Sequence, residues 1–294
     1  MRHVRGALTT LLLVLNLAIC GTPIFLLGLM KRLIPVRRVE RRLVLIGVWI
    51  AERWVAGNNH LFDTLLDTRF STDADQISDR QGHSLIISNH QTWVDIFVLQ
   101  RIFHERTAFP RFFLKHQLLW LPILGQACWA LDFPFMKRYS PQYLEQHPEK
   151  RGTDLATTRQ ACERYRQIPV SILNFVEGTR FTNEKHDEQG STYRHLLVPR
   201  TGGIAFVVAS LGDQLDALYD VTIAYPGSPD VSFWDFVTNR VPAITARVRR
   251  REIPAEFFDA AVTEHGPLRG EFKHWIQELW REKDELLDTL TSEH

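Results

Sequence analysis

Residues 87–97 read ISNHQTWVDIF, and they join an apolar run to a helical pattern. The run at residues 85–87 is continuous Leu-Ile-Ile, which predicts a short buried strand. Residues 92–103 then follow a helical pattern. A strand that leads directly into a helix is the repeating unit of a layered α/β fold. His90 and Asp95 stand at the junction, where two ionisable side chains next to a buried strand require an explanation.

The same alternation of strand and helix continues toward the C-terminus. Strands are predicted at residues 112–114, 170–176, 217–224 and 244–248, and helices at residues 118–129, 155–166, 203–211 and 272–290. We therefore expect residues 68–294 to form one α/β domain, in which a layered sheet is flanked by helices.

The N-terminal segment has a different character, because residues 6–30 carry no charged side chain. About 20 apolar residues suffice for a membrane-spanning helix. Pro23 interrupts the run and is expected to kink or break a helix, so the segment either spans the bilayer or lies bent in one leaflet. The alternative is a cleaved signal peptide. Apolarity continues to Met30, past any plausible cleavage site, which favours an uncleaved anchor.

A second helix is expected after Pro35, with one apolar face formed by Val39, Leu43, Ile46, Ile50 and Trp54. Tryptophan and arginine side chains on this segment suit a bilayer interface, although a helix that packs on a core has the same periodicity. We expect residues 1–67 to anchor the protein to the inner (cytoplasmic) membrane. The larger basic cluster follows the apolar run, which predicts that the active domain faces the cytosol.

Composition argues against several classes of function. Apolar residues make up 45% and charged residues 23% of the chain, as in ordinary globular proteins. A net charge of +1 gives no general attraction for nucleic acid, so no nucleic-acid partner is expected. Cys20, Cys128 and Cys162 are far apart, which argues against a disulfide framework and against a cysteine zinc site.

The spacing of His90 and Asp95 allows two interpretations. Five residues turn a helix by about 140°, so the two side chains meet only if His90 precedes the helix and Asp95 lies in its first turn. The helix N-terminus then keeps the imidazole neutral, and the carboxylate fixes its tautomer, as a general base requires. Alternatively, Thr92 and Asp95 have the spacing of a capping box, in which case His90 is an ordinary loop residue.

Residues 172–182, ILNFVEGTRFT, end a predicted strand in a basic turn. Gly178 permits a sharp turn, and Arg180 then lies at the C-terminal edge of the sheet, where α/β proteins bind ligands. A guanidinium group matches two phosphate oxygens. The alternative is a surface turn with an ion pair between Glu177 and Arg180. Arg138 ends another apolar run, and Pro199 precedes a glycine-rich helix start.

These four blocks occur in an order that resembles the glycerolipid acyltransferase family, the lysophosphatidic acid acyltransferases and their relatives. The resemblance covers roughly residues 80–226. The stretches EGTRFTNEKH and HLLVPRTGG are most similar to the branch that contains the lysocardiolipin and other lysophospholipid acyltransferases. Val176 and Lys137 depart from the family pattern, which commonly has proline and an acidic residue at these two positions, and both departures fit that branch.

The resemblance implies a role for each block. His90 is implied as the base, Asp95 as its partner, and Pro199 as part of a block that binds the acyl donor or shapes the site. The phosphate site of the acceptor is implied to consist of Glu177, Gly178, Thr179 and Arg180, with a contribution from Arg138.

The implied reaction moves a fatty acyl group from acyl-CoA or acyl carrier protein to the sn-2 hydroxyl of a lysophospholipid such as lysophosphatidic acid. It belongs to phospholipid synthesis or remodelling, it takes place at a membrane, and it needs no cofactor or metal. A backbone N–H near Gln91 is a candidate for stabilising the oxyanion. Two alternatives remain: a metal-dependent phosphoesterase with His83, His90 and Asp95 as ligands, and a membrane-anchored lipid-binding scaffold without activity.

Overall fold

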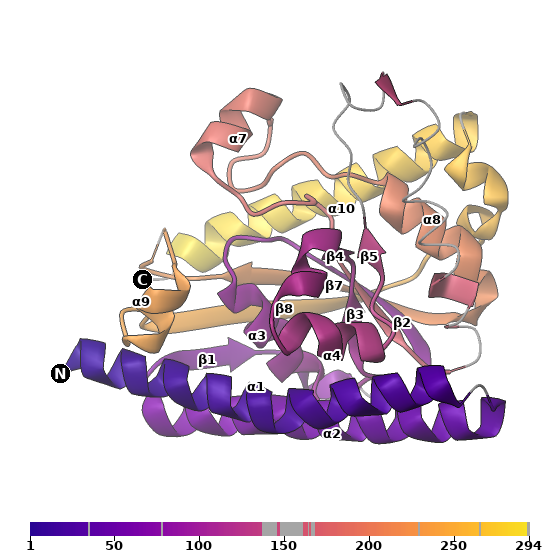
Figure 1. Cartoon of the computed structure of the whole chain (residues 1–294). Coiled ribbons are helices and arrows are strands. Elements are labelled where there is room, and N and C mark those ends of the chain that lie inside the picture. Colours follow the sequence, from indigo (N-terminus) through magenta and orange to yellow (C-terminus); the bar gives the residue numbers. More distant parts are fainter. Residues whose placement is uncertain are drawn as a thin grey trace.

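A central sheet with helices on both faces forms the body of the protein (Figure 1). The computed structural model describes residues 1–34, 36–77, 79–136, 146–147, 161–163, 165, 168–228, 230–264 and 266–292. Its helices are α1 (Arg2–Leu33), α2 (Arg37–Leu65), α3 (Val94–Phe103), α4 (Leu124–Ala130), α7 (Asn183–Gln189), α8 (Gly202–Leu211), α9 (Phe233–Val237) and α10 (Pro267–Ser292). Its strands are β1 (Arg69–Thr72), β2 (His83–Ser88), β3 (Pro110–Phe112), β4 (Leu114–Lys115), β5 (Phe135–Met136), β6 (Ser171–Phe175), β7 (Leu215–Ala224) and β8 (Ala243–Arg251).

The main sheet has the strand order β1-β8-β7-β2-β6-β3. All neighbouring strands are parallel except β7 and β8, which are antiparallel. Strand β2 therefore lies between the parallel strands β6 and β7, and all three end at the same edge of the sheet. This arrangement confirms the predicted layered α/β fold, and it brings the residues that follow β2, β6 and β7 close together.

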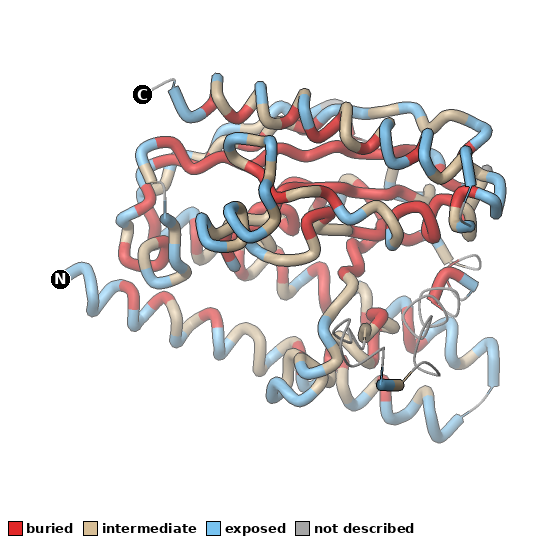
Figure 2. The backbone as a smooth tube through the Cα atoms, turned by 90° about the horizontal axis from the view of Figure 1, so that it is seen from above, coloured by how far each residue is buried: buried red, intermediate tan, exposed pale blue. Residues whose placement is uncertain are grey.

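The apolar run in β2 serves two cores, one on each face of the sheet. Ile86 packs into a core with residues of α1, α2, α3 and α4, whereas Leu85 and Ile87 pack into a core with residues of α8 and α10. Successive side chains of a strand point to opposite faces, so a strand covered on both sides reads as a continuous apolar run. Figure 2 shows the buried strands between helices whose outer turns are exposed.

Helix α1 lies along the domain and packs on it from end to end. Its glycines allow close approach, because a Cβ atom at Gly6 would come within 2.5 Å of Thr238, and one at Gly21 within 2.6 Å of Ile123. On its other flank, the Asn16 amide donates to the Trp54 carbonyl of α2. Buried and exposed turns alternate along α1 (Figure 2). The helix is long and apolar enough to cross a membrane by length and composition.

Several sequence predictions of local structure need correction. Helix α1 continues through Pro23, because residues on both sides of the proline, Gly21 and Ile24, are buried against neighbouring helices. The helix predicted at 118–129 is two elements, a 3₁₀ helix at His116–Trp120 and α4, separated at Ile123, which has a left-handed φ of 65°. Most of the helix predicted at 155–166 lies outside the described residues.

Candidate active site

His90 and Asp95 form a direct pair at the C-terminal end of β2. His90 lies in the turn after the strand, Asp95 lies in the first turn of α3, and Nδ1 of His90 is 2.8 Å from Oδ2 of Asp95. The same carboxylate oxygen accepts the backbone N–H groups of Gln91 at 2.6 Å and Thr92 at 2.9 Å. Both interpretations of the spacing therefore hold in part, since Asp95 binds the imidazole and also stabilises the turn before the helix.

These bonds correct one expectation about the oxyanion. The N–H of Gln91 is already donated to Asp95, so it is not free to stabilise a developing negative charge. Asp95 is completely buried, and its second oxygen, Oδ1, accepts the hydroxyl of Tyr225 at 2.5 Å. Burial raises the pKa of Tyr225 well above its usual range, and the charge of Asp95 raises it further, so the hydroxyl stays protonated and donates.

The sequence interpretation did not select Tyr225. The available signal was its place directly after the strand predicted at residues 217–224, in a Tyr-Pro pair. A link to Asp95 depends on the pairing of β7 with β2, which the linear sequence does not state.

The imidazole of His90 is held on one side and open on the other. Its ring stacks on the ring of Phe175, with centroids 3.8 Å apart and an angle of 13° between the planes. The side chain keeps 14% of its surface exposed. Nε2 of His90 makes no hydrogen bond with any residue that the structure describes. The nitrogen opposite Asp95 is therefore available to a substrate.

The turn after β6 is attached to the backbone of His90 from two sides. Gly178 has a φ of 72°, a conformation that glycine adopts without strain. Beside it, Glu177 accepts the N–H of His90 at 3.3 Å and, through its other oxygen, the N–H of Leu197 at 3.2 Å. Phe181 donates its N–H to the carbonyl of His90 at 2.7 Å.

Glu177 is almost completely buried, so its carboxyl group does not face solvent. The pKa of Glu177 is raised to about 8, and burial is the main cause. The charge of Asp95 also raises it, whereas the two N–H groups and Lys283 lower it. The alternative of a surface ion pair between Glu177 and Arg180 is wrong, because the carboxylate is committed to backbone amides below the surface.

Arg180 is exposed and lies beside the start of α3. Its guanidinium is 5.2 Å from the ring centre of Trp93, which precedes α3. Lys185 of α7 donates to the Thr179 hydroxyl at 3.0 Å and to the Arg180 carbonyl at 2.9 Å. Within the described residues, Arg180, Lys185 and Arg200 have no acidic partner. Among the described residues, the positive charge at and beside this turn is therefore not paired with an acidic side chain, as suits an anion site.

The fourth predicted block joins the same site. Arg200 donates its N–H to the carbonyl of Val176 at 2.8 Å, which places the buried Pro199 beside the end of β6. Arg138 lies outside the described residues, as does Lys137. The structure thus brings together every predicted site residue that it describes: His90, Asp95, Glu177, Gly178, Thr179, Arg180 and Pro199.

The metal-dependent alternative required His83, His90 and Asp95 in one place. His83 begins β2, and its Nδ1 accepts the N–H of Val170 at the opposite edge of the sheet. A strand rises about 3.3 Å per residue, so the two histidines are on the order of 20 Å apart. Among the described residues there is also no group of three or more His, Cys, Asp or Glu side chains arranged to hold a metal ion. That ligand set is therefore wrong.

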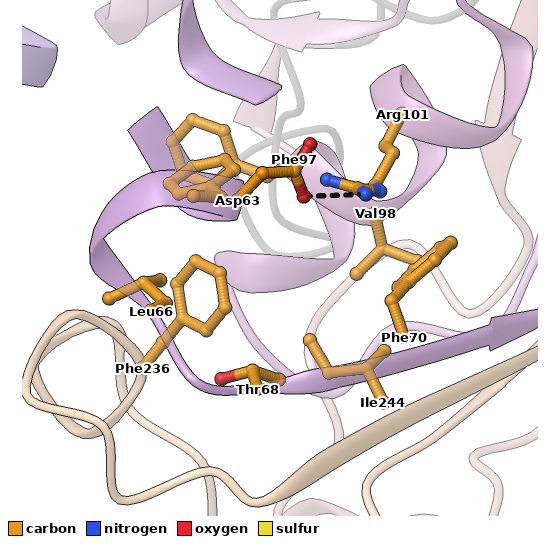
Figure 3. Close-up of a pocket in the computed structure, with 10 residues that line it drawn as sticks. Asp63, Leu66, Thr68, Phe70, Phe97, Val98, Arg101, Phe236 and Ile244 are labelled. Carbon is orange, nitrogen blue, oxygen red and sulfur yellow. Dashed lines mark ion pairs between the residues drawn. The ribbon is translucent and has the colours of Figure 1, made fainter. Parts of the chain in front are cut away.

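A separate cavity of about 240 Å³ lies between α2, β1, α3 and α9 (Figure 3). Aromatic rings line it, and an ion pair of 2.7 Å between Arg101 and Asp63 lies at its wall. Its residues on α3 begin at Phe97, beyond Asp95, and none of the predicted site residues borders it. The cavity is therefore not part of the candidate active site.

Comparisons with known proteins show the family and the fold of the chain. A family model described as Acyltransferase matches residues 69–226, a range that includes all the predicted site residues. Lysocardiolipin acyltransferase 1 of Danio rerio is 28% identical over 255 residues, which are 81% of this chain and 61% of that protein. The 1-acyl-sn-glycerol-3-phosphate acyltransferase 3 of Arabidopsis thaliana is 24% identical over 269 residues, which are 86% of this chain and 63% of that protein.

The chain thus spans about three fifths of the length of these curated relatives. The crystal structure of the 1-acyl-sn-glycerophosphate (LPA) acyltransferase PlsC from Thermotoga maritima has the same fold. It superimposes with a TM-score of 0.53 at 16% identity and covers 98% of both chains.

Proposed function

The chain belongs to the acyltransferase family, and we propose that it transfers a fatty acyl group from a thioester donor to the sn-2 hydroxyl of a lysophospholipid. The donor is acyl-CoA or acyl carrier protein, and the acceptor is lysophosphatidic acid or a related lipid. One observation carries the proposal: the His90–Asp95 pair and the basic turn at residues 177–181 are bonded to each other through the backbone of His90. A base and an anion site thus lie within one substrate's reach.

The arrangement of hydrogen bonds assigns the base to one atom of His90. Nδ1 is engaged by Asp95, so Nε2 accepts the proton of the acceptor hydroxyl while the oxygen attacks the thioester carbonyl. Asp95 stabilises the imidazolium that results. The tetrahedral intermediate then collapses, the carbon–sulfur bond breaks, and the thiolate takes the proton from His90. The products are the diacyl lipid and the free thiol.

We assign the acceptor's phosphate to the exposed Arg180, which has no acidic partner among the described residues, with the turn at Gly178 and Thr179 beside it. A guanidinium grips two phosphate oxygens at once, which fixes the orientation of the hydroxyl relative to His90. Glu177 contributes by holding the turn on the His90 backbone rather than by touching the lipid. Arg138 remains a proposed contributor, and Pro199 shapes the neighbouring wall.

Residues 1–67 form the proposed membrane attachment, and residues 68–294 form the proposed acyltransferase domain. The apolar side chains on the outward face of α1 are strongly exposed, as for Leu11 at 55% and Ile19 at 71%. Exposed apolar surface of this extent marks an interaction site. The opposite face of α1 packs on the domain along its length, which supports a helix that lies in one leaflet. The larger basic cluster after the apolar run supports a domain on the cytosolic side of the cytoplasmic membrane.

A transfer assay with the full-length chain in phospholipid vesicles tests this proposal. Lysophosphatidic acid and a labelled acyl-CoA are mixed with the protein, with and without a chelator, and acyl carrier protein replaces CoA in a parallel series. We expect labelled phosphatidic acid at the same rate with and without chelator. Release of inorganic phosphate would instead indicate a phosphoesterase, and lipid binding without product from either donor would indicate a scaffold.

A further inference from the structure

Tyr225 is placed against Asp95 by the pairing of two strands. Strands β2 and β7 are parallel neighbours, with Ser88 opposite Val221. The side chain of Asn89 extends this pairing beyond the end of β2, because its amide accepts the N–H and donates to the carbonyl of Ile223, both at 2.9 Å. The two chain segments therefore remain side by side as far as the catalytic turn, and Tyr225 lies two residues further along.

The two oxygens of Asp95 have different partners. Oδ2 accepts from His90 and from two backbone amides, whereas among the described residues Oδ1 accepts from the hydroxyl of Tyr225 alone, at 2.5 Å. Asp95 is completely buried, and Tyr225 is 5% exposed, with its ring in the core. The bond is thus shielded from bulk solvent, and a buried carboxylate oxygen without a donor is strongly destabilised.

We propose that Tyr225 is a positioning residue for acyl transfer, whose hydroxyl holds Asp95 in the orientation that leaves Nε2 of His90 free to accept a proton. The inference rests on the proposed role of His90 as the base. Tyr225 acts through Asp95 and does not reach the reacting atoms. Removing the hydroxyl leaves the charge of Asp95 less compensated, so Asp95 binds the imidazolium more tightly and His90 loses its proton at a higher pH.

Within the part of the chain that the structure describes, Glu177 is the further ionisable group that contacts the pair, through the backbone of His90, and the charges of Asp95 and Lys283 act on its pKa. Replacing Tyr225 leaves the bonds of Glu177 to His90 and Leu197 unchanged. A change in the pH dependence of activity therefore reports on Asp95 and His90.

The chain contains a control tyrosine in the strand that leads to Tyr225. Tyr219 of β7 is 3% exposed, and its hydroxyl donates to a carboxylate oxygen of Asp79. Tyr219→Phe thus removes the same type of Tyr–Asp bond, from β7 itself and away from His90. A hydroxyl that serves stability alone leaves the turnover of the folded protein unchanged at either position, whereas a positioning hydroxyl affects turnover at Tyr225.

The experiment compares Tyr225→Phe, Tyr219→Phe and His90→Ala in the full-length protein, with lysophosphatidic acid and acyl-CoA in mixed micelles. For Tyr225→Phe we expect kcat to fall roughly tenfold with both KM values changed less than about twofold, since positioning acts on the transition state. The acid limb of its kcat/KM profile moves up by about 0.5–1 pH unit. Tyr219→Phe keeps the kcat and the pH profile of the wild type.

Equal kcat and equal pH profiles for the two Tyr→Phe variants, with His90→Ala inactive, would overturn this inference and leave the proposed function intact. Full activity of His90→Ala would instead overturn the proposed base. If Tyr225→Phe does not fold, a protein with 3-fluorotyrosine at position 225 is used instead, because this side chain keeps a hydroxyl that is a stronger donor. The acid limb of the kcat/KM profile of that protein then moves to lower pH, and an unchanged limb would contradict the inference.

Discussion

The ring of His90 lies flat on the ring of Phe175, with centroids 3.8 Å apart. Phe175 ends β6, the parallel neighbour of β2, so one strand pairing supplies both this wall of the imidazole and the carboxylate of Glu177 that accepts the His90 N–H. His90 is therefore held by packing as well as by hydrogen bonds.

Phe175→Leu keeps most of the apolar volume but removes the flat face. We expect kcat to fall about three- to tenfold because the imidazole gains rotational freedom, while KM changes little. A volume-conserving substitution costs less than about 1.5 kcal/mol of stability. Steady-state kinetics and thermal unfolding on the same preparation check both values, and an unchanged kcat would show that the stack is dispensable.

His90→Ala should lower kcat by roughly 10²–10⁴-fold, the usual contribution of a general base. Its melting temperature should fall modestly, because the substitution also removes the stack on Phe175 and the bond to Asp95, so turnover is compared on protein shown to be folded. Asp95→Asn should lower both activity and melting temperature, since an amide cannot accept all four donors that surround Asp95. Near-normal turnover by folded His90→Ala would contradict the mechanism.

Arg180→Lys should raise the KM for lysophosphatidic acid about tenfold, because one ammonium replaces a fork that contacts two phosphate oxygens. The KM for the acyl donor should change less than about twofold, as expected for a contact made only with the acceptor. Monoacylglycerol, which has no phosphate, is the control acceptor, and its rate should not depend on this substitution. A selective rise in the donor KM would move Arg180 to the phosphates of the coenzyme.

Glu177 makes stability depend on pH, because burial raises its pKa to about 8 from an ordinary value of 4.5. Below the ordinary value the group is protonated in both folded and unfolded chains. Between the two values the folded chain holds a proton that the unfolded chain has lost, so stability falls as the pH rises. Above pH 8 both are ionised and the loss stops.

Glu177→Gln replaces the titrating carboxyl group with an amide that does not titrate in this pH range. The quantity to follow is the unfolding free energy of the wild type minus that of the variant. We expect it to fall by up to about 1.4 kcal/mol per pH unit as the pH rises from 5 to 8. Urea unfolding at several pH values measures it, and other titrating groups cancel in the difference. Parallel curves for the two proteins would show that Glu177 is ionised at neutral pH.

Charges on the outward face of α1 should release the protein from membranes. Leu11→Asp with Ile19→Asp alters two exposed side chains, so folding is preserved, yet each charge costs about 2.5–3.5 kcal/mol in hydrocarbon. We expect the variant to stay in the supernatant after vesicle sedimentation. The matched Leu11→Ala, Ile19→Ala variant should still sediment, and sedimentation of both would contradict the attachment by α1.

Local patterns predicted the parts of the site that neighbouring residues determine. A separation of five residues across a strand-to-helix turn allowed the His90–Asp95 pair beside a capping alternative, and the apolar runs of β2, β6 and β7 indicated buried strands. Short or half-exposed elements gave no such signal. Strand β1 has only four residues, with alternating exposure, and it was not predicted.

The unpredicted contacts depend on the order of strands in the sheet. Two contacts do not follow from any motif: the bond of the buried Glu177 to the His90 backbone and the bond of Tyr225 to Asp95. Each joins residues more than 80 positions apart in the sequence. Likewise, the left-handed Ile123 that separates α4 from the preceding 3₁₀ helix is a β-branched residue where glycine or asparagine would have been the usual signal.

The strand order also fixes a sequence of events during protein synthesis. Strand β1 follows directly after α2, but it pairs only with β8, and Gly6 of α1 packs on Thr238 near α9. Strand β8 leaves the ribosome about 170 residues after β1, on the order of ten seconds or more later at common rates of translation, and Thr238 follows Gly6 at a greater distance still. During that interval the apolar α1 has no completed domain to cover it. If α1 is the proposed anchor, we expect it to reach the bilayer before the domain is complete.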